Sequence, residues 1–404
     1  MELRTEVLII GGGLVGGTMA CALGRYGVPC VVVDRDDPST LTDEGYDGRC
    51  SAVALACQKV LAGVGLWQHM ADQCQPIEHI RVADGQSLLF LHYDHRDVGD
   101  EPMGYMAENR HMRRAIYRQL DTLPDVTHLA PHSVVALDRG PDGAVAELED
   151  GRIIRAKLVV AADGRRSPTR EAAGIPIHGW DYNQDGIVMT VWHERDHNGT
   201  AIEHFLPAGP FGILPLKGGH HSSLVWTERR PLVAELMGLD DATFHAELMK
   251  RFGDFLGDVK VVSKRFHYPL SLQFARRYTD RRLALIGDAA HGMHPVAGQG
   301  MNFGLRDVAV LAEKIVEAHR LGLDVGTITV LDDYQRLRRF DNMLMLGMTD
   351  ALVRLFSNDI PPLRLARDVG MAVVNKINPA KKFFMRHAMG EVGALPKLMR
   401  GQSL

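Results

Sequence analysis

The chain has 404 residues, 46% of them hydrophobic, and a formal net charge of −4. This length provides for two intergrown domains with full cores, and the weak negative charge argues against a nucleic-acid partner. The five cysteines are odd in number and show no zinc spacing, so we expect reduced thiols and no metal site.

The first 34 residues predict a βαβ unit. The apolar run at 7–10 is typical of a buried parallel strand, residues 14–26 predict a helix, and Cys30 to Asp34 predict a second strand. The segment lacks the features of a signal peptide, and no uncharged apolar run reaches the roughly 18 residues that a membrane-spanning helix requires. We therefore expect a cytoplasmic protein.

A glycine-rich turn joins the first strand to the helix in the pattern Gly11-x-Gly13-x-x-Gly16. Gly11 permits the tight turn, Gly13 lets the backbone approach a pyrophosphate, and Gly16 lets the helix pack closely on the strand. The helix N-terminus offers free N–H groups to the anion, and Asp34 can accept hydrogen bonds from an adenosine ribose. The turn predicts a dinucleotide site but does not distinguish NAD from FAD.

The next segments indicate that the first sheet continues. Asp-Gly pairs at 142–143 and 150–151 interrupt alternating apolar residues and predict two tight hairpins. Residues 157–164 and 282–288 return to the buried-strand pattern and predict two further buried strands.

Between these two strands the pattern changes. Residues from about 180 to 275 hold short β-like runs followed by a predicted helix at 241–252. We therefore expect a second, sheet-based domain inserted into the first. From about Val330 onward the pattern is helical, with a break at Pro361-Pro362.

A second glycine-rich stretch follows the strand that ends at Gly287-Asp288. Asp288 can hold a ribityl hydroxyl, while Gly298, Gly300 and the start of the next helix offer N–H groups to a second anion or to a flavin pyrimidine edge. A second ribose-and-anion region so far along the chain suits a long ligand such as FAD. No second strand–Gly-x-Gly-x-x-Gly–helix unit occurs, so a nicotinamide cofactor would have no domain of its own.

These motifs resemble those of the single-component FAD-dependent aromatic hydroxylases with the p-hydroxybenzoate hydroxylase fold, above all the ubiquinone-biosynthesis hydroxylases (the UbiH/UbiF/VisC group). The resemblance spans essentially the whole chain, and its most specific stretch runs from His294 to Asp307. The family's three fingerprints correspond to 11–16, 162–167 and 287–288.

The resemblance implies an α/β fold with a Rossmann-type FAD-binding domain, an inserted mixed-sheet substrate domain and a C-terminal helical region. The predicted bounds are 1–75, 101–180 and 276–330 for the FAD-binding domain, 76–100 and 181–275 for the substrate domain, and 331–404 for the helical region.

The resemblance also implies individual cofactor contacts. Asp163 and Gly164 would touch both FAD and the passing NAD(P)H, Arg49 would lie near the isoalloxazine, and Arg110, or a neighbour within 109–113, would lie near the pyrophosphate. The residues predicted to bind FAD are Gly11, Gly13, Leu14, Val15, Gly16, Asp34, Arg35, Arg49, Arg110, Asp163, Gly164, Gly287, Asp288, Pro295, Gly298, Gln299, Gly300, Met301 and Asn302.

The implied reaction is hydroxylation of the aromatic ring of a polyprenyl phenol or benzoquinol in ubiquinone biosynthesis. NAD(P)H reduces the flavin, O2 gives a C4a-hydroperoxide, and OH passes to an electron-rich ring. The protein must exclude water, orient the lipophilic phenolic substrate and stabilise charge. The motifs do not identify a catalytic base.

Two other functions remain open. A flavin monooxygenase of another phenol, in catabolism or secondary metabolism, would share these motifs, whereas a halogenase would need a catalytic lysine and a tryptophan-rich motif that we do not find. A non-catalytic lipid carrier of the same fold is disfavoured by the intact Asp163-Gly164 and Gly287-Asp288 pairs.

Some residues allow two interpretations each. The Met- and Leu-rich stripe within 343–356, with nearby basic residues, would suit a peripheral contact with the inner membrane or a quinone-biosynthesis complex, but helix packing explains it more simply. Phe205, Phe211 and Trp226 fit either an aromatic pocket or the core of the inserted sheet.

Two further pairs are assigned structural roles. His291 and His294 lack a metal-ligand partner set, so we expect them to pack or hydrogen-bond near the flavin. Cys50 and Cys57 are too far apart for the redox pair of flavin disulfide reductases, so we expect buried thiols.

Overall fold

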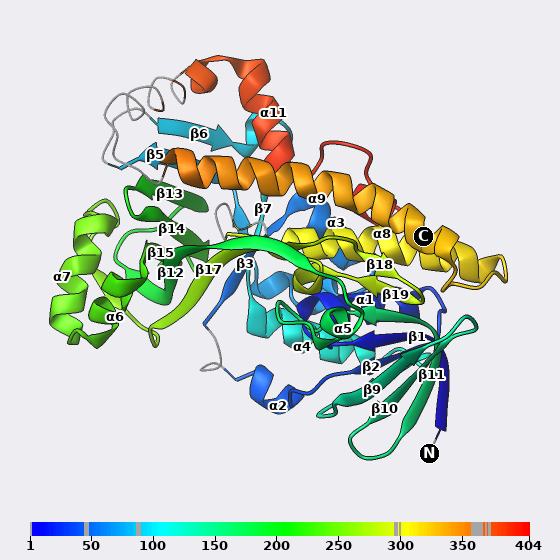
Figure 1. The fold of residues 1–404 in the computed structure, drawn as a ribbon. Helices are drawn as coiled ribbons and strands as arrows, with labels where there is room; N and C mark the ends of the chain where they lie inside the picture. Colours follow the sequence, from blue (N-terminus) through cyan, green and yellow to red (C-terminus); the bar gives the residue numbers. More distant parts are fainter. Residues whose placement is uncertain are drawn as a thin grey trace.

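The computed structural model describes residues 2–43, 48–85, 90–294, 298, 300–356, 367, 370 and 373–404 (Figure 1). An eight-stranded sheet forms the first layer. Its strands are β1 (Glu2–Ile10), β2 (Cys30–Val33), β8 (Val126–Leu129), β9 (Val134–Arg139), β10 (Ala144–Leu148), β11 (Ile153–Ala161), β18 (Thr279–Asp280) and β19 (Leu283–Leu285). Their order is β18-β19-β11-β1-β2-β8, with β10 and β9 added antiparallel beside β11.

The predicted strands of this sheet are confirmed. β1 pairs in parallel with β2 and β11, and β11 pairs in parallel with β19. The Asp-Gly pairs at 142–143 and 150–151 form the turns of the two antiparallel hairpins. Residues 7–10 are buried because strands flank β1 on both sides and helices cover it, which explains their continuous apolar run.

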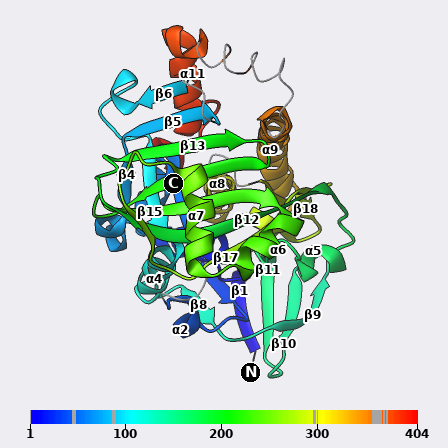
Figure 2. The same cartoon turned by 90° about the vertical axis from the view of Figure 1, so that its left-hand side faces the viewer.

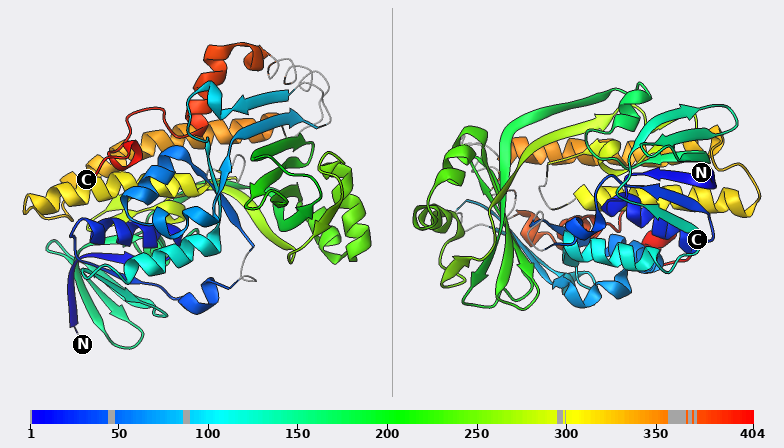
Figure 3. Two further views of the ribbon diagram at one scale, coloured as in Figure 1. Left: turned by 180° about the vertical axis from the view of Figure 1, so that it is seen from behind. Right: turned by 90° about the horizontal axis from the view of Figure 1, so that it is seen from below.

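Helices α1 (Leu14–Arg25), α4 (Asn109–Leu120) and α8 (Gly300–Arg320) lie side by side against the sheet, and α3 (Leu55–Gly63) packs on α8 (Figure 3). α1 can approach α4 closely because Gly17 has no side chain; a β-carbon there would collide with Ile116. Asp37 and Ser167 accept hydrogen bonds from backbone N–H groups and so cap the short helices α2 (Pro38–Leu41) and α5 (Pro168–Ala172).

A nine-stranded sheet forms the second layer. Its strands are β5 (His79–Asp84), β6 (Phe90–Asp94), β12 (Ile177–His193), β13 (Thr200–Leu206), β14 (Gly209–Leu216), β15 (His221–Arg229), β16 (Val259–Val261), β17 (Phe266–Ala275) and β20 (His291–Gly292). Their order is β20-β17-β12-β15-β14-β13-β5-β6, with β16 on β12. The predicted mixed sheet is thus present. The division into two domains at the predicted bounds remains our proposal.

The two faces of this sheet differ. Helices α6 (Arg230–Gly238) and α7 (Asp241–Phe252) cover the outer face (Figure 2). Phe211 and Trp226 are fully buried there against Phe244, so their interpretation as core is confirmed. Phe205 points to the inner face and packs on Phe356, with ring centroids 4.2 Å apart.

Three strands and the long C-terminal helices join the two layers. β3 (Cys50–Ala54), β7 (Gly104–Glu108) and β4 (Gln75–Ile77) form a small sheet, and α9 (Ile328–Phe356) runs past both large sheets to α11 (Asn378–Ala388) (Figure 1). The predicted break at Pro361-Pro362 lies outside the described residues. Single 3-10 turns occur at Trp67–His69, Ala71–Gln73, His95–Asp97, Gly287–Ala289 and Leu398–Arg400.

Within the described ranges, no helix is both long enough and apolar enough to cross a membrane.

Candidate active site

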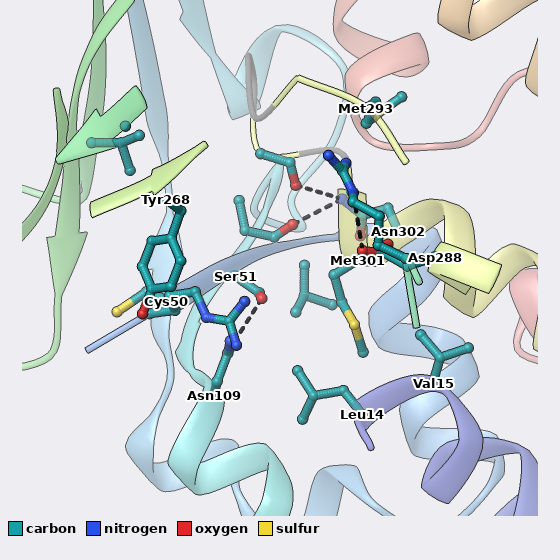
Figure 4. A pocket seen from close by; sticks show the side chains of 18 of the residues that line it. Leu14, Val15, Cys50, Ser51, Asn109, Tyr268, Asp288, Met293, Met301 and Asn302 are labelled. Atoms are coloured by element: carbon teal, nitrogen blue, oxygen red, sulfur yellow. Dashed lines mark hydrogen bonds and ion pairs between the residues drawn. The ribbon is translucent and has the colours of Figure 1, made fainter. Parts of the chain in front are cut away.

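A cavity of ≈ 1780 Å³ extends from the β1–α1 turn to the inner face of the second sheet (Figure 4). Pockets for drug-sized ligands usually measure about 300–1,000 Å³, so this cavity has room for more than one ligand. Fourteen of the nineteen predicted cofactor residues line it: Gly11, Gly13, Leu14, Val15, Asp34, Arg35, Arg49, Asp163, Gly164, Asp288, Gly298, Gly300, Met301 and Asn302.

The first glycine motif has the shape that a pyrophosphate site requires. Gly11 has φ +100°, and a β-carbon on it would collide with the carbonyl oxygen of Ala162. A β-carbon on Gly16 would collide with the carbonyl oxygen of Gly11, so Gly16 serves packing and does not line the cavity. Gly13 borders the cavity and has no atom within 4 Å of a β-carbon position. Of the three motif glycines, Gly13 is therefore the one with open space beside its backbone for a ligand.

Asp34 is held at the edge of the cavity by two backbone groups. Its Oδ2 accepts a hydrogen bond from the N–H of Gly12 at 2.7 Å, and its Oδ1 accepts one from the N–H of Asp36 at 3.0 Å. The carboxylate therefore connects the end of β2 to the glycine-rich turn, next to Arg35 on the cavity wall. Its contact with a ribose remains a prediction.

Asp163 presents a buried acceptor at the end of β11. Its Oδ2 accepts a hydrogen bond from the N–H of Thr169 at 3.0 Å. Its Oδ1 is buried and has no hydrogen-bond partner among the described residues. The next residue, Gly164, has φ +83° and open space where a side chain would be. An unsatisfied buried acceptor costs about 1–3 kcal/mol, so this position fits a ligand that donates a hydrogen bond.

A buried ionic network holds the second motif in place. Asp307 accepts hydrogen bonds from the N–H of Gly287 at 2.9 Å, from His291 Nε2 at 2.6 Å and from Arg338 Nε at 2.8 Å. Burial favours a higher pKa for Asp307, but the charges of His291 and Arg338 and their hydrogen bonds outweigh it and hold the pKa below its usual value. The residue that follows Gly287, Asp288, lines the cavity with its side chain 56% exposed.

This network corrects the predicted role of Gly287, which does not line the cavity. Its N–H is bound to Asp307 and its φ is +57°, so it shapes the turn that presents Asp288. His291 hydrogen-bonds as expected. Arg338 was not identified from the sequence because it lies in α9, outside any motif.

The start of α8 clamps β3 beside the cavity. Asn302 Nδ2 donates to the carbonyl oxygen of Ala52 at 2.8 Å, and Asn302 Oδ1 accepts from the N–H of Ala54 at 2.9 Å. The side chain of Asn302 is therefore occupied by the protein, although the residue lines the cavity beside Met301 (Figure 4). Pro295 and Gln299 lie outside the described residues.

The helix arginine near the predicted pyrophosphate is better matched by Arg113 than by Arg110. Arg110 does not line the cavity, and its Nε pairs with Glu108 at 2.9 Å. Arg113 is buried, lines the cavity and donates to the carbonyl oxygen of Leu41 at 3.3 Å. Arg49 also lines it, and its guanidinium lies 5.1 Å from the ring centre of Tyr268.

The two thiols near the site differ from each other. Cys57 is buried, as expected, and burial raises its pKa to about 11. Cys50 is only half-buried and lines the cavity, so its prediction as a buried thiol was wrong. Strand β3, which begins at Cys50, forms one wall of the cavity (Figure 4).

One metal-like cluster lies elsewhere. Within the described part of the chain, His79, His92 and Asp94 place ligand atoms within 4.8 Å of one another. Asp94 is already paired with Arg96 at 2.6 Å, so we keep the prediction of no metal site.

Comparison with known proteins decides the family. A model of the FAD binding domain matches residues 4–340. The chain is 59% identical over 402 residues to the ubiquinone hydroxylase UbiL of Rhodospirillum rubrum, which covers 99% of this chain and 93% of the relative. The chain belongs to the FAD-dependent ubiquinone hydroxylases.

Two further similarities agree with this family. The 3-demethoxyubiquinol 3-hydroxylase of Escherichia coli is 35% identical over 388 residues, covering 96% of this chain and 98% of the relative. The p-nitrophenol 4-monooxygenase PnpA of Pseudomonas putida DLL-E4 shares the fold, with a TM-score of 0.82, 22% identity and coverage of 98% and 100%. The family's cofactor, FAD, fits the open backbone at Gly13 and the unpaired Asp163 Oδ1.

Proposed function

We propose that this FAD-dependent monooxygenase hydroxylates the aromatic ring of a polyprenyl phenol or benzoquinol during ubiquinone biosynthesis, with NAD(P)H as electron donor and O2 as oxidant. The observation that carries the proposal is the continuity of the cavity, which leads from the glycine motifs to an apolar chamber. Bound FAD would supply electron transfer from NAD(P)H and activation of O2. The names of the relatives support ubiquinone precursors as the substrate class.

The chain's own part is to bind and orient the substrate away from water. The inner face of the second sheet contributes Val82, Val188 and Val225 to the chamber. The opposite wall comes from α9 and α11, which contribute residues such as Leu355 and Phe384. Apolar walls favour a ring with a prenyl tail and exclude the water that would quench a reactive intermediate.

Purified protein provides the direct test. It is expected to carry FAD and to convert a prenylphenol with a short tail into a product that contains one atom from ¹⁸O2, measured by mass spectrometry. A protein that binds FAD but yields no labelled product from prenylphenols, while hydroxylating a tail-free phenol, would instead be a monooxygenase of another pathway. Loss of FAD binding would favour the lipid carrier.

Mass spectrometry of a deletion strain tests the pathway independently. A prenylated ubiquinone precursor that lacks one ring hydroxyl is expected to accumulate. A normal ubiquinone profile would contradict the assignment.

We also propose a peripheral contact with the inner membrane, where a substrate of this kind is found. The prediction that the Met- and Leu-rich stripe packs between helices holds for three of the seven stripe residues whose side chains the structure describes. Met345, Leu346 and Phe356 are buried, whereas Met343, Leu344, Met348 and Leu355 are exposed. Further exposed apolar residues near these are Phe340, Val373, Ile377, Phe383 and Phe384, and exposed basic residues are Lys376, Lys382 and Arg386.

This surface joins apolar and basic side chains, as membrane-bound amphipathic segments do. The same helices line the chamber, so a prenyl tail could pass between them into the lipid. Flotation with vesicles of phosphatidylglycerol and phosphatidylcholine is expected to carry the protein upward, and Phe340→Ser with Phe383→Ser should weaken this. Equal recovery with and without the vesicles would refute the contact.

A further inference from the structure

Glu203 places a carboxyl group on the wall of the apolar chamber. It lies on β13, where Val82 of β5 and Gly212 of β14 stand directly opposite it. Both neighbours line the same cavity. A β-carbon on Gly212 would lie 3.4 Å from Glu203 Oε2, so the carboxyl group extends over this glycine.

The carboxyl group of Glu203 has no hydrogen bond or ion pair with any described residue. Removing this group from bulk water raises its pKa to about 7, and no charged neighbour contributes to the shift. The residue is partly buried, and its carboxyl group faces the cavity. A carboxyl group that faces a ligand chamber without a partner is therefore a candidate functional group.

The other ionisable groups that face this end of the chamber do not serve Glu203. Arg367 is bound to Asp84 at 2.7 Å, and His387 Nε2 contacts the sulfur of Met345 at 2.7 Å. Tyr93 on β6 lines the same cavity. The carboxyl group of Glu203 thus remains available to a ligand.

We propose that Glu203 accepts a hydrogen bond from the ring hydroxyl of the phenolic substrate and takes up its proton during hydroxylation. This inference rests on the proposed function. The phenolic O–H bond breaks, an O–H bond forms on the carboxylate, and the electron pair stays on the phenolate oxygen. That pair delocalises into the ring and makes its carbon a stronger nucleophile. That carbon takes OH as the O–O bond of the oxygen donor breaks, and the phenolate oxygen becomes the carbonyl of a dienone. The ring carbon then loses its hydrogen as a proton to the oxygen left on the donor, while the carboxyl group returns its own proton to the carbonyl oxygen and the ring becomes aromatic again.

The position of the carboxyl group suits this role. A proton acceptor works best when its pKa lies near the working pH, and a typical contribution is about 10²–10⁴-fold in rate. Apolar walls around the carboxyl group strengthen its hydrogen bond to a phenol. A ring whose hydroxyl group is blocked cannot donate this hydrogen bond.

Binding of two ligands to the FAD-loaded enzyme tests the proposal without turnover. The probes are 2-prenylphenol and its methyl ether, followed by the change in flavin absorbance. Wild type above pH 7 is expected to bind the phenol about 10- to 100-fold more tightly than the ether. Glu203→Gln should lose most of this preference, while Glu147→Gln, an exposed glutamate on β10, should keep it.

Turnover supplies the second measurement. Hydroxylation by Glu203→Gln should fall about 10²–10⁴-fold, and Glu203→Asp should recover part of the loss. In wild type, the rate should rise with pH through about 7 as the carboxyl group loses its proton, and Glu203→Gln should lose this rise. A Glu203→Gln protein that binds FAD and keeps both the phenol preference and the pH profile would overturn the proposal.

The outcomes separate this inference from the proposed function. If wild type neither binds nor hydroxylates the prenylphenol, the proposed function fails. If wild type does both and the variant matches it, only the role of Glu203 fails. Should Glu203→Gln not fold, the pH dependence of the phenol preference in wild type decides, because the ether's affinity should not change through pH 7.

Discussion

The two ends of the cavity are built in opposite ways. At the FAD end, glycines and paired polar groups dominate, and Asp34 and Asp307 each accept hydrogen bonds from the backbone. At the substrate end, apolar side chains dominate, and Glu203 has no partner among the described residues. The FAD end leaves a single buried oxygen, Asp163 Oδ1, without a partner among the described residues for a cofactor that stays bound, whereas the other end leaves a whole carboxyl group for a ligand that enters and leaves.

The largest expected effect tests the FAD end. Gly16→Val should abolish FAD binding and activity together, because the new side chain would collide with the carbonyl oxygen of Gly11. The ratio of FAD to protein after purification measures this. Gly99→Ala, at a glycine with open space around it, is the matched control and should keep full FAD content. A Gly16→Val protein with normal FAD would refute the tight strand–helix packing.

The next largest effect concerns the network beneath the second motif. Asp307→Ala removes the acceptor of three buried hydrogen bonds and leaves the buried Arg338 with Asp341 as its one remaining carboxylate partner among the described residues, which should lower the free energy of unfolding by about 3–5 kcal/mol. Urea denaturation measures the change. Asp333→Ala removes a surface pair with Arg336 in the same helix and should cost at most about 1 kcal/mol. Equal losses of stability for the two substitutions would show that the buried network stabilises the fold no more than a surface ion pair does.

A third prediction concerns the pH dependence of stability at the substrate end. The folded-state pKa of Glu203 is raised to about 7, above its ordinary value near 4.5, so folding favours the protonated form. Stability from this group is full below about pH 4.5 and is lost as the pH rises through 7, by up to roughly 3 kcal/mol. Glu203→Gln should therefore be more stable than wild type at pH 8 and similar to it at pH 4.5. A constant difference over this range would contradict the assigned pKa.

The smallest effect distinguishes two neighbouring arginines on α4. Arg113→Met should weaken FAD binding by about 1.5–3 kcal/mol if its guanidinium meets the cofactor phosphates, whereas Arg110→Met should change it little. Titration of the apoprotein with FAD measures both affinities. The reverse order would restore Arg110 as the cofactor residue.

The difference between the two ends of the cavity also explains which features could be predicted from the sequence. The FAD end depends on backbone shape, and glycines at fixed spacing report backbone shape locally. Gly11, Asp163 and Asp288, which were predicted to bind FAD, all line the cavity. The strands around them were found because a buried parallel strand needs a continuous apolar run.

The remaining features depend on contacts between distant segments. Glu203 carries no local signal, since its setting comes from its register with β5 and β14. Arg338 reaches Asp307 because α9 folds back against α8. The choice between Arg110 and Arg113 depends on the rotation of α4, which the sequence predicts less sharply than the presence of the helix. Which residues of the stripe in α9 are exposed likewise depends on what packs beside that helix.

The two-faced second sheet has a consequence for how this enzyme can be changed. Alternation along each strand assigns the residues that form the core, such as Phe211 and Trp226, to one face and those that line the chamber, such as Gly212 and Val225, to the other. A substitution at Gly212 or Val225 reshapes the chamber without entering the aromatic core. The positions that shape the chamber are therefore separate from the positions that stabilise the fold. Substitutions on the inner face are accordingly the way in which engineering, or evolution, can alter the ring and tail that the enzyme accepts.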